Sequence, residues 1–416
     1  MTPSAPEKPG AAPWRRTLYI LVFTQMITGV GFSSIFPFLP LYVKSLGAVT
    51  PLGTDLLSGL VFSAQAFTMM IASPFWGALA DRWGRKLMVE RAMFGGAVIL
   101  LLMAFVRSAE ELVVLRTIQG LITGTIGAAN ALVASQVPRE RTGYAMGLLQ
   151  VGMGCGVGLG PVIGGALADA FGYQAAFYVT SALLAISGTI VLFGVHENFV
   201  APETAGGRRP GFRSEWRHIF AAPGVLATYS LRFTDSMVRM LFIPILPLFA
   251  LELIAEATGV NSFTGLVIGS AAAAAAVFAV VFGRLGDRIG HRWIVITCSV
   301  LGCGSFLLQS MATNAWYFLF LQVAAGMAHG GVITGVSALL ARYTVCGEEG
   351  SVYGLDNSIN AGARALAPMI GVSVAMWFGL RAVFSTAALL YLIAALLALR
   401  GLPRAATLCK PDAANR

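Results

Sequence analysis

Charge is what this sequence has least of: Asp, Glu, Lys and Arg make up only 11% of its 416 residues. A soluble domain has roughly 25% charged residues, so a surface that faces mainly water is excluded. Hydrophobic residues make up 57% of the chain, and the mean hydropathy is +0.77. This composition predicts an all-α membrane protein that crosses the bilayer many times.

Cysteine and histidine are also scarce, with five Cys and four His residues. The cysteines form no CxxC pair and have no metal-ligand spacing, which argues against a structural zinc site and against disulfides. The sequence contains no recognisable nucleophile–base set and no cofactor-binding motif. It therefore predicts a protein that is not an enzyme, without catalytic, cofactor-binding or metal-binding residues.

Long apolar runs dominate what is present. About twelve of them approach the ~20 residues that cross a ~30 Å hydrocarbon core. We expect helices there, because a helix satisfies its own backbone polar groups in lipid. The expected spans are 17–41, 55–77, 86–106, 111–136, 142–168, 174–195, 224–250, 260–284, 292–312, 315–341, 350–378 and 381–400.

Lysine and arginine predict the orientation of these spans. If the N-terminus is cytoplasmic, the basic residues outside the spans lie almost entirely on the cytoplasmic side; only Lys44, Arg107 and Arg381 do not. This asymmetry follows the positive-inside rule, so both termini are expected in the cytoplasm. The net charge of +9 is then a topology signal, and no nucleic-acid partner is needed to explain it.

The second part of the sequence repeats the first at a nearly constant offset. Pro37 and Pro40, near the outer end of the first span, recur 207 residues later as Pro244 and Pro247. The stretch GALADRWGRK at 77–86 recurs as GRLGDRIGHR at 283–292. We therefore predict two pseudo-symmetric six-helix halves, residues 1–195 and 224–416, joined by a cytoplasmic linker at 196–223. Two such halves around a central pathway are typical of secondary transporters.

Three motifs carry a family resemblance: GALADRWGRK (77–86), LRTIQG (115–120) and GVGLGPVIGG (156–165). In this order and on these spans they resemble motifs of the major facilitator superfamily, in particular the twelve-span drug:proton antiporters of the bacterial multidrug efflux type. The resemblance implies the major facilitator fold and a place in the bacterial cytoplasmic (inner) membrane. It also implies export driven by a proton gradient without a cofactor. We expect a monomer whose partners are the lipid bilayer, a small-molecule substrate and protons.

The first motif lies where the second span leaves the membrane, and the resemblance implies a cytoplasmic gate there, beside the start of the eleventh span. A carboxylate at a helix N-terminus contributes ~0.3–1 kcal/mol when exposed and up to ~2 kcal/mol when partly buried. Asp81 is therefore expected to act as a releasable latch, although the basic residues could serve topology alone. The expected gate residues are Gly77, Asp81, Arg82, Gly84, Arg85 and, in the second half, Asp287.

The run GMGCGVGLGPVIGG (152–165) has glycine at every fourth position. A phosphate-binding loop is excluded, because no strand precedes the run and no ribose-binding acid follows it. On a helix these glycines form a ridge that admits a neighbouring backbone. We predict that the ridge packs against the alanine-rich eighth span as a sliding seam between the halves; close packing without a functional role is the alternative. Pro161 is expected to bend the helix. The residues of this interdomain helix are Gly152, Gly156, Gly160, Pro161, Gly164 and Gly165.

Charges inside the spans are functional candidates, because each costs at least ~2.5–3.5 kcal/mol in a membrane. The first half has one clear case, Arg116, and no acid well inside a span. In the second half, charged and amide residues recur on one face of the seventh span and on one face of the eleventh. These pathway candidates are Arg232, Asp235, Arg239, Asp356, Asn357, Asn360 and Arg364.

Asp235 or Asp356 is predicted to carry the proton; the alternative is that Arg232–Asp235–Arg239 and Asp356–Arg364 are structural ion pairs that hold helices together. His329 in the tenth span either relays protons or packs as a neutral side chain. The four arginines within the spans outnumber the two aspartates and leave the interior at +2. A positive interior favours an anionic or zwitterionic substrate.

Two functions remain open at this point. The first is a proton-coupled antiporter that exports small amphipathic or drug-like compounds by alternating access. The second is an exporter, less readily an importer, of an anionic or zwitterionic metabolite such as a siderophore. A receptor or scaffold is disfavoured, because the spans contain buried charges and the longest loop is short.

Overall fold

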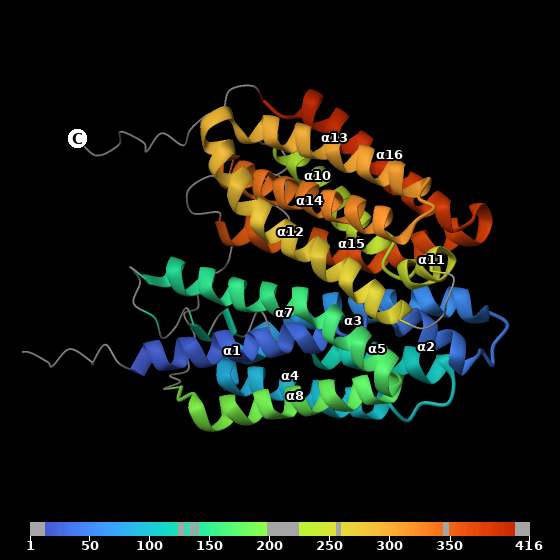
Figure 1. Cartoon of the computed structure of the whole chain (residues 1–416). Helices are drawn as coiled ribbons and strands as arrows, with labels where there is room; N and C mark the ends of the chain where they lie inside the picture. Colours follow the sequence, from blue (N-terminus) through green and yellow to red (C-terminus); the bar gives the residue numbers. More distant parts are fainter. Residues whose placement is uncertain are drawn as a thin grey trace, which may run out of the picture.

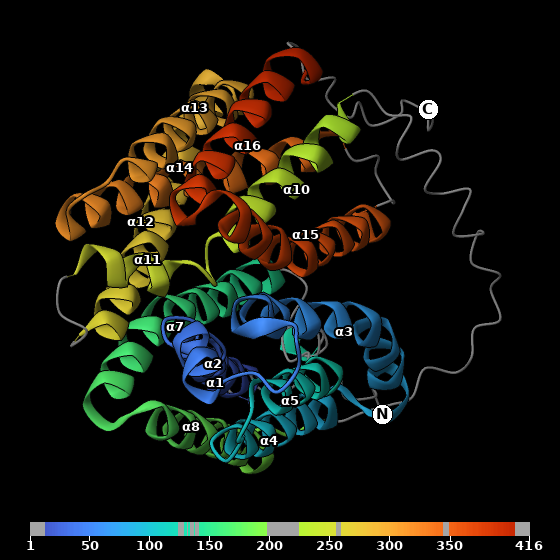
Figure 2. The ribbon, with the colours of Figure 1, turned by 90° about the vertical axis from the view of Figure 1, so that its right-hand side faces the viewer.

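The computed structural model describes residues 13–123, 129–130, 132–133, 137, 141–197, 224–254, 259–343 and 349–403. All regular structure within these residues is helical. Figure 1 shows long helices packed side by side in two bundles, and Figure 2 shows the bundles from the end.

The first bundle contains the helices that precede residue 195. They are α1 (Pro13–Ser33), α2 (Leu39–Leu46), α3 (Gly53–Trp83), α4 (Arg85–Met103), α5 (Ala109–Ile122), α7 (Thr142–Phe171) and α8 (Tyr173–Gly194).

The second bundle repeats the same order of long and short helices. It contains α10 (Val225–Leu241), α11 (Leu246–Leu253), α12 (Val260–Ile289), α13 (His291–Ser310), α14 (Ala315–Tyr343), α15 (Glu349–Phe378) and α16 (Leu380–Gly401). The division at 1–195, 196–223 and 224–416 remains our proposed one, because most of the linker lies outside the described residues.

Eight of the described helices are long and apolar enough to cross a membrane, and the bent pair α10 and α11 adds a ninth span. The other spans expected from the sequence coincide with α1 and α2, with α4 and with α5. Helix α4 is less apolar because Arg85, Lys86, Glu90 and Arg91 occupy its first turns. The span expected at 111–136 is described as far as Thr123 and only in part beyond it.

The first and seventh spans are broken at equivalent places. Helix α10 meets α11 at an angle of 50°, and α1 is separated from α2 by a short stretch of turns. The second residue of each short helix is a proline, Pro40 in α2 and Pro247 in α11. Proline has no N–H to donate to the preceding turn but fits the start of a helix, so the repeated prolines place both breaks.

The repeat extends from the sequence to individual contacts. Several glycines face a backbone carbonyl of a neighbouring helix so closely that a Cβ atom would overlap it, and they do so in matching pairs 206 or 207 residues apart. In the first pair, Gly120 faces the Gln65 carbonyl and Gly326 faces the Ala271 carbonyl. In the second pair, Gly164 faces the Ser34 carbonyl and Gly371 faces the Leu241 carbonyl. These contacts hold α3 to α5, α12 to α14, α1 to α7 and α10 to α15, so each joins two helices of the same half.

The halves touch each other mainly along two pairs of helices, α7 with α12 and α3 with α15, and also where α2 meets α11 (Figure 2). We call the end of the molecule where α2 meets α11 the outer end, and the end where α1 begins the inner end (Figure 1). At the outer end, a Cβ atom on Gly59 of α3 would lie 3.0 Å from Val372 of α15. Gly147, near the inner end of α7, has open space beside it. The halves are therefore packed together at the outer end.

The glycine ridge of α7 does not face the eighth span, and this part of the prediction is wrong. A Cβ atom on Gly152 would lie 2.6 Å from the Val22 carbonyl oxygen, and one on Gly160 would lie 2.7 Å from the Val30 carbonyl oxygen. Both carbonyls belong to α1, in the same half. The ridge packs on α1 because α7 carries small residues on more than one face. Its members are Gly152, Gly156, Gly160 and Gly164.

A different face of α7 meets α12. A Cβ atom on Gly269 of α12 would lie 2.8 Å from the Gly158 carbonyl oxygen, and Gly265 faces the carbonyl of Pro161. Gly165 of α7 in turn faces the carbonyl of Asn261. Of the predicted interdomain residues, Pro161 and Gly165 thus lie between the halves. Helix α7 is continuous through Pro161.

Candidate functional site

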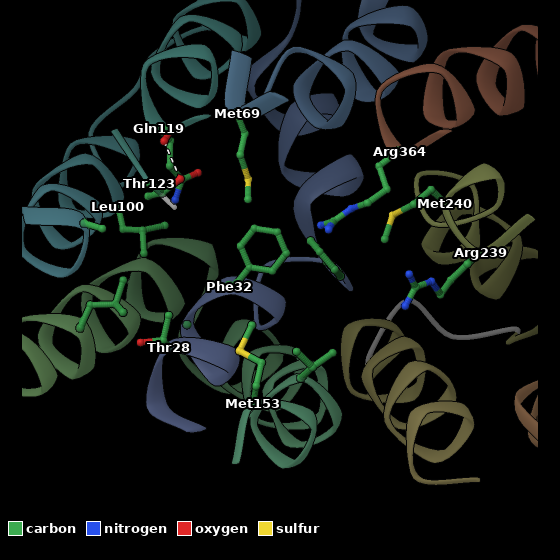
Figure 3. A pocket seen from close by; sticks show the side chains of 15 residues that line it. Thr28, Phe32, Met69, Leu100, Gln119, Thr123, Met153, Arg239, Met240 and Arg364 are labelled. Carbon is green, nitrogen blue, oxygen red and sulfur yellow. Dashed lines mark hydrogen bonds between the residues drawn. The ribbon is translucent and has the colours of Figure 1, made fainter. Parts of the chain in front are cut away.

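A cavity of about 170 Å³ lies between the two halves. The first half contributes mainly apolar and sulfur-containing side chains, such as Phe32 and Met69, with Thr28, Gln119 and Thr123 as polar groups. The second half contributes Arg239 of α10 and Arg364 of α15, which lie on one side of the cavity (Figure 3). The full lining is Thr28, Gly31, Phe32, Phe36, Met69, Ala92, Leu100, Gln119, Thr123, Met153, Val157, Leu184, Arg239, Met240 and Arg364.

Both arginines of the cavity point toward the apolar wall of the first half. The Arg364 guanidinium carbon lies 5.7 Å from the centroid of the Phe32 ring, within the range of a cation–π contact. No acid is among the described residues that line the cavity. The cavity therefore has two cationic groups on one side and an apolar surface on the other.

Asp235 lies within the second half, with only 2% of its surface exposed. Its Oδ1 atom lies 2.9 Å from Nδ1 of His329 on α14 and accepts a hydrogen bond of 3.1 Å from the Tyr391 hydroxyl on α16. Two partners from two other helices thus surround a carboxylate of α10. This cluster, Asp235–His329–Tyr391, joins α10, α14 and α16.

Asp356 has a different partner. Arg232 of α10 donates to it from Nε at 3.1 Å and from Nη2 at 2.9 Å, an ion pair that joins α10 to α15. One turn further along both helices, the Ser236 hydroxyl donates to the amide oxygen of Asn360. The Asn360 amide also donates to Asp356 at 3.4 Å. These contacts hold the seventh and eleventh spans together.

The structure thus brings most of the predicted pathway residues together, but in different pairs. Asp356 pairs with Arg232 rather than with Arg364, and Asp235 contacts His329 and Tyr391 rather than the arginines of its own helix. Two of the four arginines are left to line the cavity. The Asn357 side chain lies outside the described residues.

Arg116 of α5 is completely buried in the first half. Its Nη1 atom donates to the side-chain oxygens of Gln65 at 2.8 Å and Gln119 at 2.9 Å. Its Nε and Nη2 atoms have no hydrogen-bond partner among the described residues. The charge is therefore solvated by amides, and Gln119 connects it to the cavity wall.

The gate motif surrounds a sharp break between α3 and α4. Gly84 adopts φ +99°, a conformation that L-residues with a side chain rarely adopt, and this allows α4 to begin directly after α3. The carboxylate of Glu197 accepts hydrogen bonds from the backbone N–H groups of Arg85 at 3.1 Å and Lys86 at 2.7 Å. Glu197 thus caps α4 from the end of the first half.

The remaining gate residues are only partly described. Arg82 is exposed, and the exposed Asp287 lies 3.6 Å from Nε2 of His291. The surroundings of Gly77 and the side chain of Asp81 lie outside the described residues, so the proposed latch stays a prediction.

Sequence reasoning missed three residues with evident contacts: Glu197, Tyr391 and Asp169 of α7, whose contacts are described below. Tyr391 lies in an apolar span and gave no signal beyond its hydroxyl group. Glu197 and Asp169 lie at span ends, where acids are common.

In the part of the chain that the structure describes, no group of three or more His, Cys, Asp or Glu side chains could hold a metal ion.

Comparison with known proteins identifies the class of the chain. A sequence model of the Major Facilitator Superfamily matches residues 21–253 and again residues 228–414. The chain belongs to the major facilitator superfamily. It is a multi-pass membrane transporter and not an enzyme, with a small molecule as its substrate and lipid around it. The all-helical fold expected from the sequence is confirmed.

Curated relatives match over almost the whole chain. The "Multidrug resistance protein MdtG" of Enterobacter lignolyticus strain SCF1 is 34% identical over 392 residues, covering 91% of this chain and 90% of the relative. The protein of the same name from Salmonella typhimurium strain LT2 is 33% identical over 382 residues, covering 90% and 92%.

Solved structures share the fold at lower identity. A bacterial homologue of the human lysosomal transporter Spinster, inward-facing and unoccupied, superimposes with a TM-score of 0.78 at 15% identity, covering 94% of this chain and 97% of the other. The human organic anion transporter MFSD10 gives a TM-score of 0.65 at 20% identity, covering 94% and 100%. The transporters of this superfamily generally use ion gradients and need no cofactor.

Proposed function

We propose that this chain is a proton-coupled antiporter that exports small amphipathic or drug-like compounds by alternating access. The observation that carries the proposal is the enclosed Asp235–His329–Tyr391 cluster, which lies in the same half as the arginines of the cavity. The curated relatives are named as multidrug resistance proteins, which supports export. We further propose that the protein is a monomer in the bacterial cytoplasmic membrane with both termini in the cytoplasm.

Within this proposal the proton carrier is Asp235. Asp235 is 2% exposed, and its Oδ1 atom lies 2.9 Å from Nδ1 of His329, so a proton can pass between the carboxylate and the imidazole ring. Asp356, by contrast, is held by the Arg232 guanidinium through two donors, an arrangement that favours two opposite charges. We therefore assign Asp356 to holding α10 against α15.

Everted membrane vesicles test this assignment. Addition of substrate should dissipate the pH gradient in the wild type and fail to do so in Asp235→Asn. Glu252→Gln is the matched control, because it removes an exposed acid of the same half that belongs to no proposed site, and it should leave the response unchanged. The assignment is wrong if the pH gradient is still dissipated in Asp235→Asn. If the gradient is maintained in Asp356→Asn alone, Asp356 is the carrier instead.

A second candidate concerns the substrate. Arg239 and Arg364 line the cavity without an acid among its described lining residues, which favours an anionic or zwitterionic metabolite over a cation. In this version the protein exports that metabolite, and import is the less favoured direction.

Intracellular accumulation of cationic dyes and of anionic metabolites in a deletion strain separates the two candidates. We expect the wild-type chain to lower the level of the anions, and Arg364→Gln to restore it. Lowered levels of the cationic dyes alone would refute the anion version and leave the exporter proposal intact.

The first motif retains its proposed role as an inner gate. Asp81 would latch the second span to the start of the eleventh when the inner end closes. Arg82 and Arg85 would add ion pairs to the same closed state.

A further inference from the structure

Asp169 lies near the C-terminal end of α7, at the outer end of the molecule. Its Oδ2 atom accepts a hydrogen bond of 2.7 Å from the backbone N–H of Ser262. Its Oδ1 atom accepts one of 2.7 Å from the Asn261 side-chain amide and one of 3.4 Å from the Asn261 backbone N–H. Asn261 and Ser262 belong to the first turn of α12. The carboxylate of one half therefore binds the start of a helix of the other half.

Helix α12 has no cap of its own. Its N-cap residue is Gly259, and no side chain from that position accepts a hydrogen bond from the helix. The first N–H groups of a helix lack partners within the helix, and they carry the positive end of its dipole. Asp169 supplies acceptors and a negative charge at that point, as an N-cap residue normally does within one chain segment.

The cap lies where the halves are pressed together. Gly165, one turn before Asp169, faces the Asn261 carbonyl, and Asn261 is 7% exposed. Separation of α7 from α12 at the outer end must break all three hydrogen bonds of the carboxylate. The contact therefore exists only while the outer end is closed.

The contact between α15 and α3, the other long contact between the halves, has no equivalent capping carboxylate among the described residues. At an offset of 207 residues, the position of Asp169 corresponds to Met376 on α15. The start of α3, which faces α15, carries Asp55, whose carboxylate pairs with Lys44 at 3.0 Å. The capping carboxylate is thus a feature of the α7–α12 side alone.

We propose that Asp169 is an outer latch: its carboxylate holds the outer end closed and sets how often that end opens. This inference rests on the proposed alternating access. Asp169 is an exposed residue, and a carboxylate at an exposed helix N-terminus changes a two-state ratio about 2- to 5-fold. We expect Asp169→Ala to raise the ratio of outer-open to outer-closed molecules by that factor, and the isosteric Asp169→Asn to raise it by less.

Electron-spin distance measurements on the purified full chain test the inference. Spin labels at Val49 and Trp316, both exposed at the outer end and in opposite halves, report the opening in a cysteine-depleted background. The matched control is Met376→Ala, which truncates the equivalent residue of α15 and should leave the ratio of short to long distances unchanged.

Four outcomes are decisive. A higher proportion of long distances in Asp169→Ala but not in Met376→Ala supports the latch. If the wild type shows both distances and Asp169→Ala leaves their ratio unchanged, the latch is overturned but alternating access is not. A single outer distance in the wild type at every pH and with every substrate overturns both. An equal shift in both variants assigns the effect to general loosening and overturns the latch.

Discussion

Replacement of Gly165 by alanine tests the position of the seam between the halves. The added Cβ atom would overlap the Asn261 carbonyl oxygen and lie 3.1 Å from the Ser262 Cα atom. Both neighbours are backbone atoms of the other half and cannot rotate away. Overpacking of this kind costs about 1–3 kcal/mol.

Because the contact forms only when the outer end is closed, the penalty falls on that state alone. A difference of about 1–3 kcal/mol changes a two-state ratio about 5- to 150-fold. We therefore expect Gly165→Ala to favour molecules that are open at the outer end and to slow transport.

Gly158→Ala is the matched control. It lies on the same face of α7, but its Cβ atom would meet only the Ala272 Cβ atom at 3.8 Å, an ordinary contact. Both substitutions gain the same helix propensity of about 1 kcal/mol, so this gain cancels in the comparison.

The assay is the labelling of Ser58→Cys by a membrane-impermeant maleimide added from the outer side. Ser58 is 2% exposed and lies beside the outer contact of α3 with α15, so it reacts only when the outer end opens. Faster labelling in Gly165→Ala than in Gly158→Ala is expected. Equal labelling in the two variants would refute the seam as described.

Three further substitutions test other contacts. Gly371→Ala would place a Cβ atom against the Leu241 carbonyl. This overpacking should lower the free energy of unfolding by about 1–3 kcal/mol, and therefore the thermal unfolding temperature in detergent. An unchanged temperature would contradict the tight α10–α15 contact. Tyr391→Phe removes one hydrogen bond to a charged group, worth about 1.5–3 kcal/mol, and should also lower that temperature; a stable variant would mean that the hydroxyl is not bound to Asp235. The pKa of Glu110 is lowered to about 2, mainly by the hydrogen bond from the Thr50 backbone. At neutral pH the Glu110 carboxylate should therefore protect the Thr50 backbone N–H from hydrogen exchange. Because a lowered pKa stabilises the ionised contact above the ordinary carboxyl pKa, the protection should be lost as pH falls toward 2. It should be absent at every pH in Glu110→Ala, which has no side-chain acceptor.

Much of the fold could be predicted because it depends on features that are local in the sequence. Length and apolarity mark a span wherever its neighbours lie, and the repeated prolines mark the two broken spans. The repeat itself reports that the halves share one packing pattern. The glycine contacts at equivalent positions, such as Gly164 with Gly371, show that the shared pattern extends to single atoms.

The partner of each helix face could not be predicted in the same way. Helix α7 has one small-residue face at 152, 156, 160 and 164 and another at 158, 161 and 165, and a rotation about its axis decides which one meets α12. The sequence does not fix that rotation. Likewise, Arg232, Asp235 and Arg239 share one face of α10, which suggested pairing within the helix. The observed partners of Asp235 come from α14 and α16, so only tertiary packing identifies them.

The near-constant offset between the halves has an evolutionary consequence for the cavity. Asp235, His329 and Tyr391 correspond, at offsets of 207, 206 and 207 residues, to Thr28, Thr123 and Leu184, and all three of the latter line the cavity. A duplicated ancestral gene with identical copies would have presented the same groups twice. Here the two paralogous copies have diverged at equivalent positions. One set surrounds a carboxylate within the second half, and the other set lines the cavity between the halves. Equivalent positions of the two copies therefore now have different chemistry.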